Sequence, residues 1–540
     1  MATQTVLELE PLSNLTPIPK QPAPEITEAP GHTISGPASS SPSAPSTAEQ
    51  EQSIPTRKLS PSRTWTVILQ LSSINLISSF SNGLLAIGLP TIAADLSIPP
   101  NLLLWPNSVF YLTCGSCLLI AGSVADVLGP KRIFLPGCFL VGVFILVCGV
   151  ARDGIELIMF RAMQGIATAM VLPSAVSIVS TNIEDGRPRN IGFASTFLAM
   201  PLGFAVGLVL GGVFVSNVGW RVGYYASGAV GMLIFGLGIW TLPGDERLGK
   251  WRDVGGRLQR EVDWVGAVIA SGSFAMVSYV LALLSANTAN IKTATGIALL
   301  VISLVLVPAF VYWMHFQEKR GKPALIPNSM WKNSAFTSVC LMIMLSSSVN
   351  SCLEIFCSLF FQQVQHNSPL TAGLKVVPQV LTGALLNLLV GTFVNRTPIA
   401  LAVLAGNILQ AGSPLLMATI NPSWPYWYSA FFAQLLAPLS VDILFTVGTI
   451  VVSNAFPAKT QALAGAVFNT FAQLGTSVGL CLMSVIQEGV ERKAGGVREE
   501  ERVMEGLRAS FWAMFGMMGV ACVVGAVGLR QVGSVGVKRD

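Results

Sequence analysis

Two carboxylates lie inside long apolar segments, where they could carry protons. Glu354 falls in the run 334–361 and Asp442 in the run 426–453. An apolar bundle disfavours the ionised form of a carboxylate, so such a group can take up and release a proton. We therefore predict Asp442 and Glu354 as candidate proton-coupling residues. Lys375, near one end of the run 371–394, could instead neutralise one of them.

A buried cation is the second candidate for chemistry. Arg161 and Gln164 lie in the apolar run 156–182, with Gly165 beside them. A guanidinium stays protonated at physiological pH, so Arg161 needs an acidic or polar partner within the protein. It could hold an anionic group or stabilise a neighbouring carboxylate. The alternative is that its side chain snorkels to the nearer membrane surface.

A charged cluster follows the run 102–122 and reads GSVADVLGPKR. It contains Gly122, Asp126, Gly129, Lys131 and Arg132. The first glycine allows close helix approach, the second can make a tight turn, and the aspartate can pair with an arginine or cap the next helix. We expect the cluster to act as a latch in a two-state motion. Alternatively, the two basic residues only set the orientation in the membrane.

Small residues recur at every fourth position of the run 190–216. They are Ser195, Ala199, Gly203, Gly207 and Gly211. This spacing places them on one helical face, where a second backbone can pack closely. A weaker version of the same pattern is formed by Gly475 and Gly479. We expect the first seam to seal one end of a pathway.

The composition of the chain shows which kind of protein must position these residues. The chain has 540 residues, 52% of them apolar and 11% charged, against about 25% charged in soluble domains. Its mean hydropathy is +0.63. These values exclude a soluble enzyme, a nucleic-acid binder and a disordered scaffold. The net charge of +5 indicates no polyanionic partner, and the lipid bilayer is the expected environment.

Apolar runs long enough to cross a bilayer follow a polar segment at 1–60 that we expect to be a disordered tail. We predict an all-α polytopic membrane protein with fourteen spans. The runs lie near 65–89, 102–122, 133–151, 156–182, 190–216, 221–242, 264–286, 293–315, 334–361, 371–394, 398–420, 426–453, 461–487 and 510–530.

The distribution of basic residues predicts the orientation. With both termini in the cytosol, twenty-one of the 32 basic residues lie at the cytosolic edge and eight lie outside, as the positive-inside rule requires. The tail has no apolar signal-peptide region, so the first span would direct insertion. We expect a multi-pass protein of the plasma membrane, with the vacuolar membrane as the alternative.

Several catalytic motifs are missing from the sequence. It contains no phosphate-binding GxxxxGK[ST] motif and no cluster with metal-ligand spacing, so we expect neither ATP hydrolysis nor a metal. The GTSVG string at 475–479 matches a nucleophile motif, but it lies inside a span without an obvious histidine partner. We expect no catalytic residues, no enzyme activity and no bound cofactor.

The motifs together resemble those of the major facilitator superfamily. GSVADVLGPKR resembles its loop signature, and Arg161-x-x-Gln164-Gly165 resembles its span-four signature. The run from Gly203 through Gly207 and Gly211 to Gly212 resembles the antiporter signature of drug exporters. The segments LPTIAADL, WRVGYY and FPAKTQALAGAVFNTFAQLG are similar to the family as well. Gly391, Asn395 and Arg396 resemble a degraded second copy of the loop signature.

The resemblance implies two six-helix bundles with two additional transmembrane helices between them in the sequence. The fourteen-span plan is similar to that of fungal drug:proton antiporters. It implies a cytoplasmic tail at 1–60, an N-terminal bundle at 61–243, a linker with the two inserted helices at 244–333, a C-terminal bundle at 334–530 and a short cytoplasmic tail at 531–540.

Two positions depart from the family pattern. Leu208 replaces the usual proline of the antiporter signature. The first span has no aspartate and offers Gln70, Asn75 and Asn82 in its place. Proton coupling would then rest on Asp442, Glu354 or Asp126. We expect the three amide side chains of the first span, with Asn469 and Gln473 of the thirteenth, to line the substrate pathway.

The resemblance implies a monomeric secondary transporter that exports amphipathic drugs, toxins or secondary metabolites, driven by the proton gradient through alternating access. An uptake carrier for a nutrient or a siderophore-type chelate is one alternative, and a facilitated-diffusion carrier is another. A membrane-bound acyl or prenyl transferase would require intramembrane histidines or paired aspartates, which the sequence does not offer. A nutrient sensor would usually need a long signalling tail.

Overall fold

The structure is a computed structural model, and parts of the chain lie outside its described residues. It describes residues 60–183, 187–244, 255–256, 258–260, 262–286, 293–322, 324–393, 398–456, 458–493 and 498–530. The predicted tails at 1–60 and 531–540 therefore lie outside the described part, apart from Ser60. Asn395, Arg396 and the side chain of Asp126 also lie outside it, whereas the backbone of Gly391 is described as part of a helix.

All regular elements of the described residues are helices. The N-terminal part contains α1 (Pro61–Asp95), η1 (Pro100–Leu102), α2 (Trp105–Leu128), α3 (Pro130–Val150), α4 (Gly154–Asn182), α5 (Arg187–Asn217) and α6 (Trp220–Thr241). Two further long helices follow, α8 (Trp264–Ala286) and α9 (Ala294–Lys319).

The C-terminal part has the same character. It contains η3 (Asn328–Lys332), α10 (Ser334–Leu359), the π-helix η4 (Phe360–Val364), α11 (Pro369–Phe393), α12 (Ile399–Ala418), α13 (Ala430–Leu436), α14 (Leu439–Ala455), α15 (Ala458–Lys493) and α16 (Glu499–Gly528).

The helices confirm the predicted multi-span membrane fold. Of the described segments, 13 are long and apolar enough to cross a bilayer, and α8 adds a shorter apolar stretch at Trp264–Ser273. Each of the fourteen predicted runs coincides with a long helix, except that the run 426–453 is divided into α13 and α14. Pro438 lies at the break, where its missing N–H removes a helical hydrogen bond.

The segment between the last two predicted runs is helical rather than a loop. The predictions ended the thirteenth run at 487 and began the fourteenth at 510. In the structure α15 continues to Lys493 and α16 begins at Glu499. Ion pairs between side chains one turn apart accompany these extensions, Arg492 with Glu488 and Arg498 with Glu501. Such pairs support helix in a charged segment, so the drop in hydropathy there does not mark a helix end.

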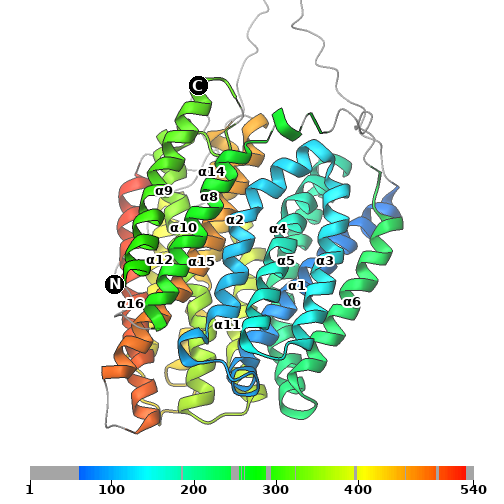
Figure 1. Cartoon of the computed structure of the whole chain (residues 1–540). Coiled ribbons are helices and arrows are strands. Elements are labelled where there is room, and N and C mark those ends of the chain that lie inside the picture. The colour runs from blue at the N-terminus through cyan, green and yellow to red at the C-terminus, as the bar shows by residue number, and fades with distance from the viewer. Residues whose placement is uncertain are drawn as a thin grey trace, which may run out of the picture. The chain divides into compact units, whose positions relative to one another are not determined.

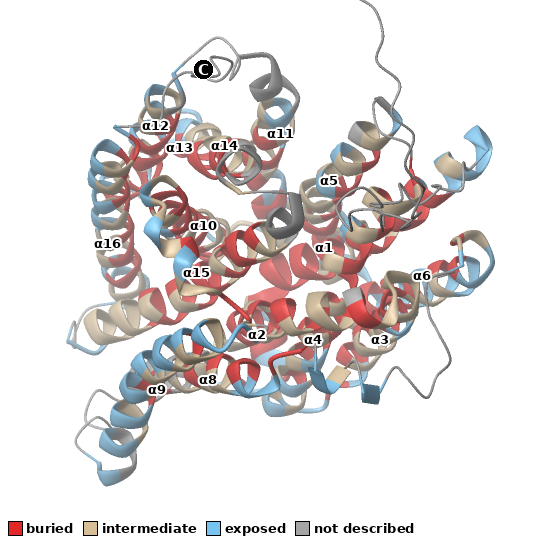
Figure 2. Cartoon of the chain, turned by 90° about the horizontal axis from the view of Figure 1, so that it is seen from above, coloured by how far each residue is buried: buried red, intermediate tan, exposed pale blue. Residues whose placement is uncertain are grey.

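The helices gather into two bundles, seen from above in Figure 2. One consists of α1 to α6 and the other of α10 to α16, and they meet along α1, α2 and α5 on one side and α10, α11 and α15 on the other. The extra helices α8 and α9 lie outside the two bundles. Helix α8 packs against α2 and α15, and α9 packs against α8 (Figures 1 and 2).

Two glycines make tight turns at opposite ends of the helices. Gly129 joins α2 to α3 with a φ of +96°, and Gly219 joins α5 to α6 with a φ of +98°. A residue with a β-carbon rarely adopts this conformation. We call the two ends of the bundles the Gly129 end and the Gly219 end. The Gly129 end is the one predicted to face the cytosol.

The small-residue seam of α5 packs against α1. A β-carbon at Gly203 would collide with the carbonyl of Leu76, and one at Gly207 would collide with the carbonyl of Phe80. From the other side, a β-carbon at Gly83 of α1 would lie 2.9 Å from the backbone nitrogen of Leu208. The two backbones are therefore in direct contact, as the four-residue spacing predicts.

The weaker glycine pair of α15 makes the corresponding contact in the second bundle. A β-carbon at Gly475 would collide with the carbonyl of Met344 on α10, and one at Gly479 would collide with the Oγ of Ser348 on the same helix. Thus α15 lies on α10 as α5 lies on α1. This correspondence is the one expected of two bundles that repeat a common plan.

Candidate functional site

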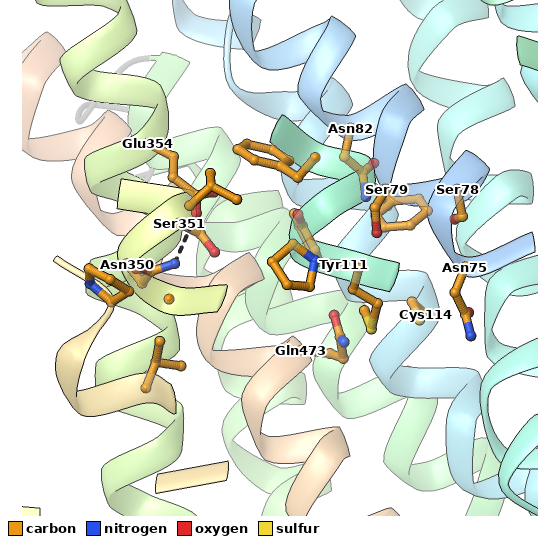
Figure 3. A pocket seen from close by; sticks show the side chains of 18 of the residues that line it. Asn75, Ser78, Ser79, Asn82, Tyr111, Cys114, Asn350, Ser351, Glu354 and Gln473 are labelled. Carbon is orange, nitrogen blue, oxygen red and sulfur yellow. Dashed lines mark hydrogen bonds between the residues drawn. The ribbon is translucent and has the colours of Figure 1, made fainter. Parts of the chain in front are cut away.

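A cavity of about 220 Å³ lies between the two bundles. One wall comes from α1, α2, α4 and α5, and the other comes from α10, α11, α14 and α15. The polar and charged residues that line it are Asn75, Ser78, Ser79, Asn82, Tyr111, Cys114, Thr168, Asn350, Ser351, Glu354, Gln379, Asp442 and Gln473. Figure 3 shows the side chains of α1 on one side and those of α10 on the other.

Arg161 is fully buried beside this cavity. Its Nη2 donates to Asn82 Oδ1 at 2.5 Å, its Nη1 donates to Gln164 Oε1 at 2.8 Å, and its Nε donates to the Pro106 carbonyl at 3.2 Å. The guanidinium also lies over the ring of Phe110, 4.5 Å from its centre. The side chain is 0% exposed, so the snorkelling alternative is wrong. All its partners in the described part of the chain are neutral.

The neighbours of Arg161 on α4 fix the distance between α4 and α2. Gln164 is fully buried and accepts a hydrogen bond from the guanidinium. A β-carbon at Gly165 would collide with Thr113 Oγ1 and with the carbonyl of Phe110. The glycine therefore permits the close approach that brings Phe110 over the guanidinium. The predicted span-four residues thus form one local network around Arg161.

Glu354 lies on the opposite wall, within a cluster of amide groups. Asn350, one turn earlier on α10, donates from Nδ2 to Glu354 Oε1 at 3.0 Å. Gln379 of α11 donates from Nε2 to the same oxygen at 3.3 Å and to Asn350 Oδ1 at 3.1 Å. No described group donates to Glu354 Oε2. One oxygen of this carboxylate thus accepts hydrogen bonds from two amides, while the other accepts none from the described residues.

Asp442 lines the same cavity from α14. Asn387 of α11 donates from Nδ2 to Asp442 Oδ1 at 3.1 Å. The other oxygen, Oδ2, faces Gly383, where an added β-carbon would lie 2.7 Å away. It has no hydrogen-bond donor among the described residues. The structure therefore brings the two predicted carboxylates into one site.

Lys375 does not neutralise either carboxylate. Its Nζ donates to Gln365 Oε1 at 3.1 Å and lies 5.0 Å from the centre of the Phe361 ring. The hydroxyl of Tyr426 donates to the backbone carbonyl of Lys375 at 2.7 Å. These contacts hold the ammonium near the Gly219 end, away from the cavity lining. The suggestion that it pairs with Glu354 or Asp442 is therefore wrong.

The five residues predicted to line a pathway divide into two groups. Asn75, Asn82 and Gln473 line the cavity. Gln70 instead donates from Nε2 to the Ile234 carbonyl at 2.6 Å, between α1 and α6. Asn469 donates to the Gly465 carbonyl of its own helix at 2.9 Å. Gln70 and Asn469 are therefore outside the cavity, because their helices turn these positions toward other neighbours.

The loop cluster lies at the Gly129 end. A β-carbon at Gly122 would lie 3.6 Å from the Pro173 side chain, so α2 and α4 are in contact there. Lys131 donates from Nζ to the Leu242 carbonyl at 2.6 Å and so caps the C-terminal end of α6, where a positive charge is favourable. Arg132 follows in the first turn of α3. The side chain of Asp126 lies outside the described part.

The bundles are in contact at the Gly219 end. Ser358 of α10 donates from Oγ to the Ala86 carbonyl of α1 at 3.3 Å, and Gln362 of η4 donates to the Ile87 carbonyl at 3.0 Å. Gln362 also donates to Ser358 Oγ at 2.9 Å. A β-carbon at Gly212 of α5 would lie 2.7 Å from the α-carbon of Leu370 on α11. The predicted seam thus ends at a contact between the two bundles.

A second contact joins α2 and α15 across the bundles. Ser108 Oγ donates to the Ser477 carbonyl at 3.0 Å and lies 3.0 Å from Cys481 Sγ. Within the first bundle, Gly211 of the seam faces Leu84 of α1, where an added β-carbon would lie 2.9 Å from the α-carbon. The contacts of Ser108 therefore join the two bundles.

The sequence prediction missed Asn350, Gln379, Asn387, Ser358 and Gln362. The four-residue spacing of Asn350 and Glu354 on one helical face was a usable signal. The sequence holds no comparable signal for Gln379, because its role depends on how α11 packs against α10.

Comparison with known proteins gives one family and a consistent set of relatives. Residues 71–330 match the family model described as "Major Facilitator Superfamily". The chain is 36% identical over 517 residues to "MFS-type transporter 1" of Pyricularia oryzae. The alignment covers 87% of this chain and 84% of that protein. It is 26% identical to "Efflux pump terG" of Aspergillus terreus, and that alignment covers 80% of each chain.

A solved structure supports the same fold. A bacterial homologue of the human lysosomal transporter Spinster, in an inward-facing and unoccupied conformation, superposes with a TM-score of 0.60. It covers 88% of this chain and 98% of its own, at 16% sequence identity. At that identity the likeness establishes the fold alone.

Proposed function

The chain belongs to the major facilitator superfamily, and on this basis we propose that it is a secondary transporter that exports amphipathic small molecules in exchange for protons. The observation that carries the proposal is the cavity between the two bundles, which holds Glu354 and Asp442. The similarity to the efflux pump of Aspergillus terreus supports the direction. The distribution of basic residues supports both termini in the cytosol, and we place the protein in the plasma membrane.

The cavity wall is suited to an amphipathic ligand. The bundle of α1 to α6 contributes Phe110, Tyr111 and Phe204 together with the serines and asparagines of α1. The opposite bundle contributes Glu354 and Asp442. Apolar surface with a few placed polar groups is typical of sites for small organic molecules.

Contacts between the bundles supply the two-state element of the proposed cycle. In the structure the Gly219 end is closed by the hydrogen bonds of Ser358 and Gln362 to α1. Rocking of the bundles would break these bonds and open the cavity to the outside. The loop cluster would then act as the latch at the opposite end, with Lys131 held against the end of α6.

The proposal can be tested with the purified full-length chain in proteoliposomes. A pH gradient should drive flux of some members of a panel of labelled amphipathic drugs, and Glu354→Gln with Asp442→Asn should abolish that dependence. Glu501→Gln is the matched control, because Glu501 is half-exposed and pairs with Arg498 at the surface. Absence of gradient-dependent flux for every compound would contradict proton antiport.

The direction requires a test in cells. Expression should lower the internal concentration of an exported compound and raise resistance to it. A higher internal concentration would instead support the uptake alternative. Flux that follows only the concentration gradient of the compound would support facilitated diffusion.

A further inference from the structure

The wall of the cavity formed by α10, α11 and α14 presents hydrogen-bond acceptors that have no donors. Glu354 Oε2 and Asp442 Oδ2 have no hydrogen-bond donor among the described residues. Gln379 contributes a third acceptor, since its Nε2 is used by Asn350 and Glu354 while its Oε1 is buried and unpaired. Gln379 is 1% exposed and lines the cavity. An unpaired buried acceptor carries a free-energy cost that a donor from a ligand can remove.

Positive charge is absent from the same lining. None of the described residues that line the cavity is lysine or arginine. Arg161 is separated from it, because Asn82 and Phe110 line the cavity while the guanidinium beneath them is fully buried. Lys375 is occupied by Gln365 and the Phe361 ring. A bound molecule therefore faces two carboxylates without an accessible counter-ion in the described lining.

The facing wall offers aromatic surface. Phe110 and Tyr111 of α2 and Phe204 of α5 line it. Such rings bury apolar groups and also attract a cation over their faces. A ligand that crosses the cavity from one wall to the other meets aromatic surface at one end and carboxylates at the other.

We propose that the cavity selects amphipathic amines in their protonated form, with the ammonium group at Glu354 Oε2 and the apolar part against Phe110 and Tyr111. This assignment of substrate class rests on the cavity being the transport site. An ammonium donates hydrogen bonds and carries positive charge, so it supplies both features that this wall lacks. A carboxylate ligand would face like charge, and an uncharged ligand would leave both carboxylates without a counter-ion.

Equilibrium binding to the full-length protein in detergent tests the proposal without a gradient. The probes are phenylbutylammonium, phenylbutanol and phenylbutanoate, which share one apolar group and differ in charge. We expect the ammonium to bind at least about tenfold more tightly than the alcohol, and the carboxylate to bind more weakly than either. Equal affinities, preference for the carboxylate, or binding of none of the three at millimolar concentration would overturn the proposal.

Variants locate the effect. Glu354→Gln should reduce the affinity for the ammonium to that for the alcohol while leaving alcohol binding unchanged, which also shows that the variant is folded. Asp442→Asn should reduce the preference by a smaller factor, and Glu501→Gln should preserve it. An unchanged preference in Glu354→Gln would contradict the assignment. Selective ammonium binding together with absent proton-driven flux would retain this inference and contradict only the proposed coupling.

Discussion

Ser358 of α10 donates a hydrogen bond from its Oγ to the carbonyl oxygen of Ala86 on α1, 3.3 Å away. Within a regular helix that carbonyl would accept from the backbone nitrogen of residue 90, but residue 90 is a proline and has no N–H. The acceptor freed by Pro90 is therefore used by the other bundle. Gln362 extends the contact to the carbonyl of Ile87.

This relationship predicts that Ser358→Ala favours opening at the Gly219 end. Loss of one side-chain hydrogen bond costs about 1 kcal/mol, which corresponds to about a fivefold increase in the open population. Alkylation of Cys481, located by mass spectrometry, measures the change, because this buried thiol lies against Ser108 where the two bundles meet. An unchanged alkylation rate would show that the bond does not hold the end closed.

The seam between α1 and α5 predicts that two chemically identical substitutions differ in their effect on stability. Gly207→Ala would drive a methyl group into the carbonyl of Phe80 and should destabilise the protein by about 1–3 kcal/mol. Gly236→Ala on α6 adds the same methyl group where no atom lies within 4 Å, and should leave stability unchanged or raise it slightly. The apparent Tm of the purified protein measures both, and equal shifts would contradict the seam.

The partners of Arg161 predict that lysine cannot replace it. The guanidinium donates to four groups, the side chains of Asn82, Gln164 and Ser81 and the Pro106 carbonyl. An ammonium cannot reproduce this planar arrangement. Arg161→Lys and Arg161→Ala should each reduce transport at least about tenfold, that is, by 1.4 kcal/mol or more. Arg530→Ala, at an exposed position, serves as the control. Normal transport by Arg161→Ala at normal expression would contradict any role for this residue.

The two cavity carboxylates predict separable losses. If Asp442 carries the proton, Asp442→Asn should retain exchange of labelled for unlabelled substrate across a membrane without a gradient, and should lose accumulation driven by a pH gradient. Glu354→Gln should lose both if it holds the substrate. Accumulation that persists in Asp442→Asn and disappears only in Glu354→Gln would assign both tasks to Glu354.

The sequence was sufficient for the helical spans and for the residues that must contact something polar. The spacing of Gly203 and Gly207 indicated a close helix contact, and burial of Arg161 required a polar partner. It could not identify α1 as the partner in both cases, because helices in a bilayer are apolar on all sides and the chain gives no direct sign of which face meets which helix. For the same reason Gln70 was predicted to line the substrate pathway, although it contacts Ile234 of α6 and not the cavity.

Only some residues of the cavity wall formed by α10, α11 and α14 could be predicted from the sequence. Glu354 and Asp442 stood out as charges in apolar runs. The donors that hold them, Gln379 and Asn387, come from α11, and their roles depend on a helix contact that the sequence does not encode locally. Positions such as these are recognised only after the helices are placed.

The position of α8 has a consequence for how a molecule dissolved in the lipid could enter. Helix α8 covers the line along which α2 meets α15, and its Ser271 donates a hydrogen bond to the Ser116 carbonyl of α2 at 3.0 Å. The corresponding line between α5 and α11, on the other side of the cavity, has no additional helix over it among the described elements. We therefore expect lateral entry from the bilayer to be asymmetric, because α8 shields the flank between α2 and α15 and no corresponding described helix shields the flank between α5 and α11.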